Sequence, residues 1–293
     1  MDAKSLAELY NEEYLRGVLL KRHPVADSCP LIFDVPRSGS DYPKEFRSPA
    51  SFDDVRRNVS MYVEELYENA PAFGATWLFA CFPNTYIDAN RNELDIDEAL
   101  ISGEPLPEFS PSDRSLRGMG LIPKFCGDGS VLLHDAPIPV EDLLHRIENY
   151  HRPYHLELSA CISRFHENFG AAYHVSCHSM SSRGSKAVRD VGSPRSDFDI
   201  GDGHGKTCSP AFVEVVRNCL SGFGYDVTVN KHFAGAESIH RHAAPTKGLH
   251  SLQIEINRSL YMDENTYRKN ENFETVKEHL TLLAQQLSKF TSS

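Results

Sequence analysis

Short apolar runs alternate with segments of helical periodicity along most of this chain, and this alternation restricts its fold more than any other feature. Runs typical of buried β-strands lie at residues 30–35, 75–82, 173–180, 225–229 and 249–256. Apolar residues recur at helical spacing from residue 51 to about 70, and over 140–165, 210–221 and 271–289. This order predicts an α/β fold: a single three-layer domain over residues 1–293, with a mostly parallel central sheet and a C-terminal helix at about 271–289.

Irregular segments interrupt this pattern. Residues 101–137 contain five prolines, so we expect an insertion or lid there. Residues 181–209 are rich in Gly, Ser and Asp and are predicted to form an active-site loop. Residues 235–248 contain His240 and His242 in a stretch rich in Gly and Ala, which predicts a loop. The helical pattern of 140–165 should be kinked or interrupted at Pro153.

Charge and apolar run length restrict the class of partner. The chain has 30 Lys and Arg against 41 Asp and Glu, a net charge of −11, which disfavours binding to a nucleic-acid phosphate backbone. Its apolar runs are far shorter than the roughly 18–20 residues that span a bilayer, and residues 1–10 show no signal core. The seven scattered cysteines form no C-x-x-C pair. We therefore expect a cytoplasmic protein with reduced cysteines that binds neither membrane nor nucleic acid.

Polar residues follow four of the apolar runs, and these clusters are the main functional signal. In open α/β sheets, ligands bind outside the carboxyl ends of the strands, so the clusters are expected to converge. A strand-end ion pair beside a turn asparagine would explain some of them without a function. The clusters are Arg37-Ser38-Gly39, Asp88-Ala89-Asn90-Arg91, His178-Ser179-Met180 and Glu255-Ile256-Asn257-Arg258.

Other chemistries find less support. The glycine-rich segment 199–205 lacks the Gly-Lys-Ser/Thr of a phosphate-binding loop and the closing Glu of a calcium loop. No G-x-S-x-G elbow presents a nucleophilic serine. His178 at a strand end could be a metal ligand, a general base or simply a hydrogen-bonded side chain.

Five motifs together resemble the N-formylglutamate amidohydrolase family from about residue 31 to 264. They are Asp34-Val35-Pro36-Arg37-Ser38-Gly39, Tyr86-Ile87-Asp88-Ala89-Asn90-Arg91, Pro153-Tyr154-His155, Cys177-His178-Ser179-Met180 and, most specifically, Gln253-Ile254-Glu255-Ile256-Asn257-Arg258 with its flanks. The resemblance implies an α/β fold similar to that of zinc-dependent exopeptidases and amidases. It also implies hydrolysis of N-formyl-L-glutamate, or a related N-acyl acidic amino acid, to formate and glutamate, the last step of one histidine degradation route.

The resemblance also assigns roles to residues. It implies a divalent metal, zinc above all, with His178 and Asp88 as ligands, while Glu255 acts as general base. The small anionic substrate would be held by guanidiniums and polar groups, because a guanidinium binds a carboxylate with two hydrogen bonds. Arg37 is expected beside the reacting group, and the substrate-binding residues would be Arg91, Asn257, Arg258 and Ser38.

The chain departs from the family pattern at the positions that should hold the metal. Arg37 stands where the family has a histidine, and a guanidinium cannot coordinate a cation. Val59-Ser60 and Ser176 stand where acidic residues are expected. Three alternatives remain open: a metal held by substitutes such as Asp34, Asp88, His155 or Glu255, a metal-free hydrolase in which Arg37 stabilises the oxyanion, or a catalytically silent paralogue that binds N-acylated amino acids. We favour an active hydrolase, since Glu255 and the arginines are retained together.

Overall fold

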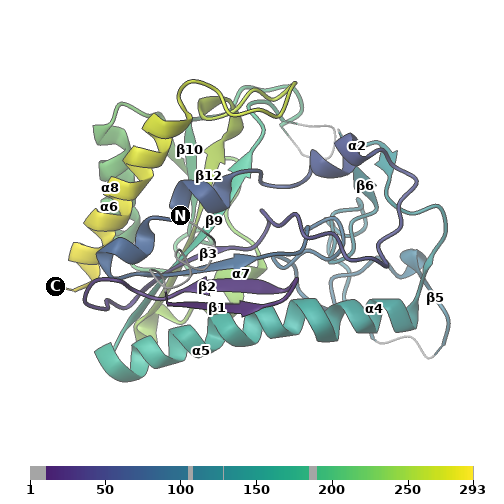
Figure 1. Cartoon of the computed structure of the whole chain (residues 1–293), viewed down its shortest axis with the longest axis horizontal. Helices are drawn as coiled ribbons and strands as arrows, with labels where there is room; N and C mark the ends of the chain where they lie inside the picture. The colour runs from purple at the N-terminus through teal and green to yellow at the C-terminus, as the bar shows by residue number, and fades with distance from the viewer. Residues whose placement is uncertain (1–10, 105–107, 128, 185–189, 293) are drawn as a thin grey trace.

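The computed structural model describes residues 11–104, 108–127, 129–184 and 190–292, and an eight-stranded mixed sheet forms its centre (Figure 1). The strand order is β1-β2-β4-β3-β9-β12-β10-β11. Four of the seven pairings are parallel in the described part of the chain, including the central β4-β3-β9-β12. This confirms the predicted α/β fold with a mostly parallel sheet. The strands are β1 Glu12–Leu15, β2 Leu19–Arg22, β3 Leu31–Val35, β4 Thr76–Ala80, β9 Ala172–Met180, β10 Phe198–Gly201, β11 Val227–Val229 and β12 Leu249–Asn257.

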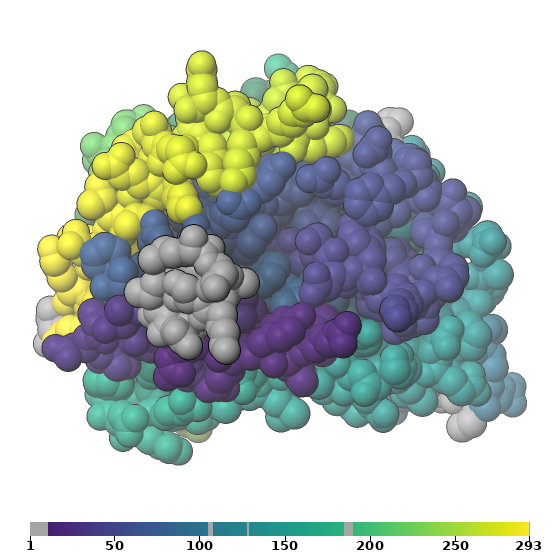
Figure 2. All heavy atoms as spheres, viewed as in Figure 1, coloured from purple at the N-terminus to yellow at the C-terminus, as the bar shows by residue number. Residues whose placement is uncertain are grey.

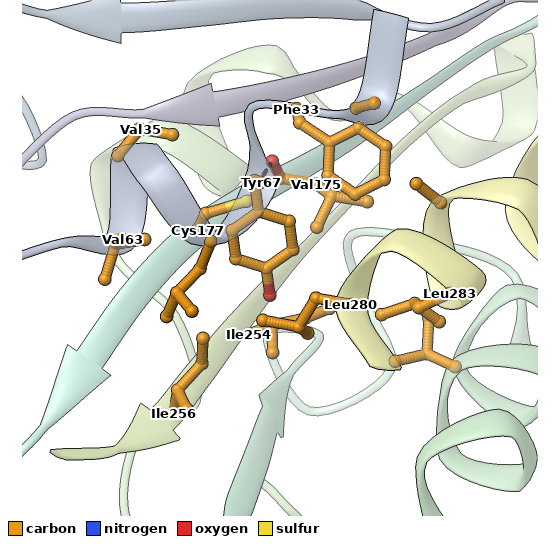
Figure 3. Close-up of a cluster of buried hydrophobic side chains, with 14 of the residues drawn as sticks. Phe33, Val35, Val63, Tyr67, Val175, Cys177, Ile254, Ile256, Leu280 and Leu283 are labelled. Carbon is orange, nitrogen blue, oxygen red and sulfur yellow. Dashed lines mark hydrogen bonds between the residues drawn. The ribbon is translucent and has the colours of Figure 1, made fainter. Parts of the chain in front are cut away.

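One face of the sheet is apolar and is covered by α3 (Val63–Tyr67), α6 (Pro210–Gly222) and α8 (Phe273–Thr291). Alternate residues of the central strands point to this face, as the two-residue period of a strand requires. Figure 3 shows their contacts with Val63 and Tyr67 of α3 and with α8. Burying each of these large side chains contributes about 1.5–3 kcal/mol, so this layer anchors the central strands. The strand residues are Phe33, Val35, Val175, Cys177, Ile254 and Ile256.

The opposite face carries the polar residues of the same strands. It is covered by α5 (Arg152–Phe169) and by α7 (Glu237–His242), and α4 (Val140–Arg146) precedes α5 along one side of the molecule in Figure 1. A π-helical turn, Ile147–His151, joins α4 to α5. Pro153 follows it at the start of α5 and has no N–H to donate within this continuous helical stretch. The predicted interruption near Pro153 is therefore this π turn.

The helix predicted from residue 51 to about 70 is wrong, because the chain forms two short helices there. Ser51 caps α2 (Phe52–Arg56), accepting a 3.2 Å hydrogen bond from the Asp54 N–H. The chain then leaves the helical path. The Ser60 N–H donates to the carbonyl of Arg37 at 2.8 Å, and Tyr62 adopts a left-handed φ of 68° before α3 begins. The detour brings Ser60 beside the loop that follows β3.

Smaller elements complete the chain, and some were not predicted. Strands β1, β2 and β10 lay outside the predicted pattern, and the 235–248 segment contains α7 rather than only a loop. The described residues of the predicted insertion, 101–104, 108–127 and 129–137, form mostly turns and short strands. The remaining elements are β5 Ile101–Ser102, β6 Phe125–Cys126, β7 Val131–Leu132, β8 Ile138–Pro139 and the 3₁₀ turns Ala70–Phe73, Glu98–Leu100, Pro245–Lys247 and Arg258–Leu260.

In the space-filling view (Figure 2), the purple and blue N-terminal third lies between the yellow C-terminal segment and the teal helices α4 and α5. Within the described ranges, no helix has both the length and the apolar character needed to cross a bilayer.

Candidate active site

The register of the sheet aligns three titratable residues across adjacent strands. On β12, Glu255 lies opposite His178 of the parallel strand β9 and opposite Asp199 of the antiparallel strand β10. Residues in register project to the same face, so all three belong to the polar face of the sheet. Asp199 uses its carboxylate to bind the next loop, accepting from the N–H groups of His232 and Phe233 at 2.7 and 2.8 Å. This loop forms part of the site.

A small cavity of about 60 Å³ lies at the carboxyl ends of the central strands. Segments far apart in the sequence meet around it, as the polar clusters predicted. Of the predicted site residues, Arg37, Arg91 and Glu255 line it. The full lining is Arg37, Asn90, Arg91, Arg114, Ser179, Phe233, Gly235, Ala236, Gln253 and Glu255.

Glu255 is the carboxyl group of this cavity, and its side chain is buried. Burial raises the pKa of Glu255 to about 7, against the opposing effect of the Arg37 charge and with a further rise from Asp199. Gln253 Nε2 donates a 2.8 Å hydrogen bond to Glu255 Oε1 and orients the carboxylate. A carboxyl group with a pKa near neutrality is suited to take up and return a proton.

Arg37 places positive charge beside Glu255. Its Nε lies 3.3 Å from Oδ1 of Asp88, which also accepts a 3.0 Å hydrogen bond from the Asn90 N–H. The Arg37 Nε–H has no partner with hydrogen-bond geometry among the described residues. The guanidinium is therefore held near the cavity by charge, with donors left for a ligand.

Two more guanidiniums face the same space. Arg91 donates from Nε to the Met119 carbonyl at 2.8 Å and from a terminal nitrogen to the Asn90 carbonyl at 2.7 Å. Burial, with repulsion from Arg37 and Arg114, lowers the pKa of Arg91 to about 10 against the pull of Asp88. Burial and the Arg37 charge also lower the pKa of Arg114. The three arginines carry three positive charges, and Asp88 and an ionised Glu255 carry two negative ones. The net charge around the cavity is therefore +1, in a chain whose net charge is −11.

His178 is a neutral imidazole in this setting. Burial lowers its pKa well below the usual value, and the charges of Arg37 and Arg91 lower it further. The Ser238 N–H donates to Asn90 Oδ1 at 2.9 Å, so Asn90 Nδ2 is the donor that meets His178 Nε2 at 3.1 Å. His178 Nε2 consequently accepts, and Nδ1 carries the proton and has no partner among the described residues.

The model of one protein family matches residues 29–262 of this chain, and its description is N-formylglutamate amidohydrolase. The chain belongs to this family. Family membership makes it a hydrolase of an amide bond, and it confirms the resemblance of the five motifs.

Named relatives agree with this assignment. N-formylglutamate deformylases of Pseudomonas putida and Pseudomonas aeruginosa are 27% and 28% identical to this chain, covering 82% and 71% of it and 86% and 72% of their own length. The crystal structure of an N-formylglutamate amidohydrolase from Ralstonia eutropha JMP134 superposes with a TM-score of 0.90 at 33% identity, over 94% of this chain and 99% of that one.

The zinc site implied for this amidohydrolase does not fit the side chains present. Among the residues that the structure describes, no three His, Cys, Asp or Glu side chains gather as ligands. Nδ1 of His178 carries the ring proton and Nε2 accepts from Asn90, and a single histidine would be too few in any case, since zinc sites use three or four protein ligands. Asp88 pairs with Arg37 instead, and the Arg37 and Arg91 charges that act on His178 would repel a cation.

The substitutes considered for the missing ligands are dispersed. Asp34 accepts from His174 Nε2 at 2.8 Å and from the Tyr154 hydroxyl at 3.1 Å. His155 meets His242 Nε2 at 3.1 Å and the Ala89 carbonyl at 2.8 Å. These contacts belong to a buried polar layer under the cavity rather than to one coordination site.

Three residues predicted to bind substrate make contacts within the protein. Ser38 donates to the Ser60 carbonyl at 2.6 Å and contacts the Glu64 carboxyl group. Asn257 Nδ2 donates to backbone carbonyls at 3.2 and 3.3 Å. Arg258 donates to the carbonyls of Arg57 and Val59 at 2.8 and 3.0 Å and to the Ser179 hydroxyl at 3.1 Å. Their donors join the loops around the cavity, and none of the three lines it.

Buried histidines support the loop that carries Asn90 and Arg91. His155 Nε2 and His151 Nε2 donate to the carbonyls of Ala89 and Arg91, each at 2.8 Å. A carbonyl only accepts, so both histidines carry their proton on Nε2. Nδ1 of His155 then accepts from His242. Burial lowers the pKa of His151 to about 4 and that of His242 to about 3, so these histidines are neutral supports.

Sequence reasoning missed several residues of the site. Gln253 could have been found, because it alternates with Glu255 on the polar face of a central strand. Glu64, in the first turn of α3, supplies the acidic group near Ser38, and burial raises its pKa to about 7. Arg114 lies in the proline-rich segment 101–137, where the sequence offers no pattern that would single it out.

Proposed function

We propose that this amidohydrolase cleaves the amide of N-formyl-L-glutamate or of a closely related N-acyl acidic amino acid, with Glu255 as general base and without a metal ion. The proposal rests mainly on one observation: Glu255, with its pKa of about 7, and Arg37 line the same cavity. The names of the related enzymes and the excess of guanidinium charge support an acylated amino acid with carboxylate groups as the substrate.

Glu255 would activate the attacking water. Its ionised carboxylate takes a proton from water while the oxygen adds to the formyl carbon, which forms a tetrahedral intermediate. Gln253 keeps the carboxylate oriented through the 2.8 Å hydrogen bond to Oε1.

Arg37 would stabilise the negative charge that develops on the formyl oxygen. The positive charge of its guanidinium, which lines the cavity, supplies the electrostatic stabilisation that a metal ion gives in other hydrolases. Arg91 would bind a substrate carboxylate, because it is buried, oriented by two carbonyls and still charged at neutral pH.

The second half of the reaction returns the proton. The C–N bond breaks as protonated Glu255 donates to the leaving nitrogen, and the products are formate and the free amino acid. No further co-reactant is needed, because one water is consumed for each amide bond broken.

The cavity has room for only a few water molecules, so access of an acylated amino acid requires the lining segments to move apart. A larger hollow of about 470 Å³ is lined by residues that directly follow cavity residues along the chain. Its lining is Asn92, Glu93, Leu94, Glu237, His240 and Arg241. The segments 90–92 and 236–237 contribute to both spaces, which makes this hollow the proposed route of access.

The test is formate release from a panel of N-acyl amino acids by wild type, Glu255→Gln and, as a matched control, Glu214→Gln on the exposed side of α6. We expect turnover of N-formyl-L-glutamate by wild type and the control, and a rate lower by a factor of about 10²–10⁴ for Glu255→Gln. Equal release by wild type and Glu255→Gln across the panel would refute the proposal. Thermal stabilisation by these ligands without turnover would instead identify a silent binding protein.

A further inference from the structure

Arg114 is a cavity residue that the proposed reaction does not use. Its backbone lies in the turn of residues 112–119, within the proline-rich segment after β5, and its guanidinium reaches the cavity of Arg37, Arg91 and Glu255. Within the described part of the chain, its side chain makes neither a hydrogen bond nor an ion pair, although it is only partly exposed. A guanidinium held beside two others without a partner is arranged for an anion that comes from outside.

The turn that carries Arg114 is tied to the site. Ser112 donates to both carboxylate oxygens of Asp95, from its N–H at 2.8 Å and its hydroxyl at 3.0 Å. The Met119 N–H donates to the Arg114 carbonyl at 2.9 Å, and the Met119 carbonyl accepts from Arg91. Arg114 and Arg91 are therefore positioned relative to each other through Met119.

The two arginines differ in how much of their donor capacity the fold uses. Arg91 gives two N–H groups to backbone carbonyls and is rigid, which suits the α-carboxylate present in every N-acyl amino acid. Among the described residues, all N–H groups of the Arg114 guanidinium remain available to a ligand. A second carboxylate, carried by the side chain of the substrate, would pair with it through two parallel hydrogen bonds.

We propose that Arg114 is the specificity-determining residue that selects acidic over neutral N-acyl amino acids by binding the side-chain carboxylate. This inference rests on the proposed function, and it states that the same site recognises the side-chain carboxylate of the substrate. Arg114 takes no part in proton transfer, so its loss should alter substrate choice rather than abolish catalysis.

The experiment compares kcat/KM for N-formyl-L-glutamate and its neutral isostere N-formyl-L-glutamine in wild type, Arg114→Met and Arg117→Met. Arg117 is a matched control, since it lies in the same turn, is exposed and does not line the cavity. Arg114→Met should lower kcat/KM for the glutamate substrate on the order of 10- to 100-fold and leave the glutamine substrate within about threefold. Arg117→Met should change neither by more than about twofold.

Equal losses on both substrates, or no loss on either, would overturn the assignment of Arg114. Thermal melting of each variant separates misfolding from altered specificity. If wild type turns over neither substrate, the proposed function fails. The role of Arg114 can then still be tested by calorimetric measurement of binding of the two ligands. Wild type should bind N-formyl-L-glutamate more tightly than N-formyl-L-glutamine, and Arg114→Met should lose this preference. A preference that persists in the variant would contradict the inference.

Discussion

His178 and Glu255 lie opposite each other in register on the parallel strands β9 and β12, so that both side chains emerge on the polar face of the sheet. The imidazole is neutral, and the carboxyl group has a pKa of about 7. The cations that act on this pair are guanidiniums, above all Arg37. Protein groups alone can therefore supply a base and a positive charge at one end of the sheet.

Replacing Arg37 tests the positive charge. Arg37→Met should lower kcat for N-formyl-L-glutamate by about 10²–10³, because one electrostatic contact to the developing oxyanion is lost. Arg37→Lys keeps the charge without the planar fork and should lose less. Steady-state kinetics checks both, and circular dichroism checks folding, since Asp88 would lose its ion-pair partner. A kcat for Arg37→Met within about threefold of wild type would contradict the role of Arg37.

Removing metal should leave the enzyme active. Among the residues with described positions, the side chains around His178 do not assemble three ligands, so purified protein should contain less than about a tenth of an equivalent of zinc, cobalt, iron or manganese. Activity after prolonged chelation should stay within about twofold of the untreated enzyme. Stoichiometric metal measured by elemental analysis, together with loss of activity on chelation and recovery on adding the ion back, would show that a metal is required.

The buried histidines should make the fold sensitive to acid. The pKa of His151 is lowered by burial to about 4, against about 6.5 in an unfolded chain. Above pH 6.5 both states are neutral. As the pH falls from 6.5 towards 4, the unfolded state binds protons that the folded state excludes, so the free energy of unfolding falls by about 1.4 kcal/mol per pH unit from this residue.

The variant His151→Gln isolates this effect, because a glutamine amide can still donate to the Arg91 carbonyl but does not titrate. Denaturant unfolding at pH 7.5 and pH 5.5 should show a smaller loss of stability for the variant than for wild type. Glu255 and Glu64 have raised pKa values and so favour the folded state at lower pH, which opposes the effect of His151. Both proteins contain these residues, so their contribution cancels when the two pH dependences are subtracted. Identical pH dependence in both proteins would contradict the neutral, buried state of His151.

Much of the fold could be predicted from the sequence, since the apolar runs and helical spacing report burial directly. The central strands appear within two residues of the expected bounds, and the long last helix is present as α8. The break between α2 and α3 could not be predicted, because it depends on the left-handed Tyr62 and on a hydrogen bond from Ser60 to Arg37, which are distant in sequence. The short edge strands β1 and β2 carry little periodic signal.

The site residues that could be predicted lie at or after the ends of strands. Arg37 follows β3, Arg91 lies in the segment after β4 and Glu255 lies near the end of β12, and the three converge on one cavity. Arg258 also follows a strand, but its guanidinium donates to backbone carbonyls. The position of an arginine in the sequence does not reveal such contacts. Arg114 reaches the site from an irregular segment whose position depends on the Asp95 and Met119 contacts.

The central claim is that Glu255 is the general base, and the pH dependence of kcat/KM for N-formyl-L-glutamate between pH 5.5 and 8.5 tests it most directly. The ionised carboxylate is the active form, so kcat/KM of wild type should rise about tenfold per pH unit below a midpoint near 7 and level off above it. Glu255→Gln should lose a factor of about 10²–10⁴ on the plateau above pH 7 and should not show this rise with pH. A flat wild-type profile, or a Glu255→Gln enzyme that retains the wild-type rate and profile, would contradict the account.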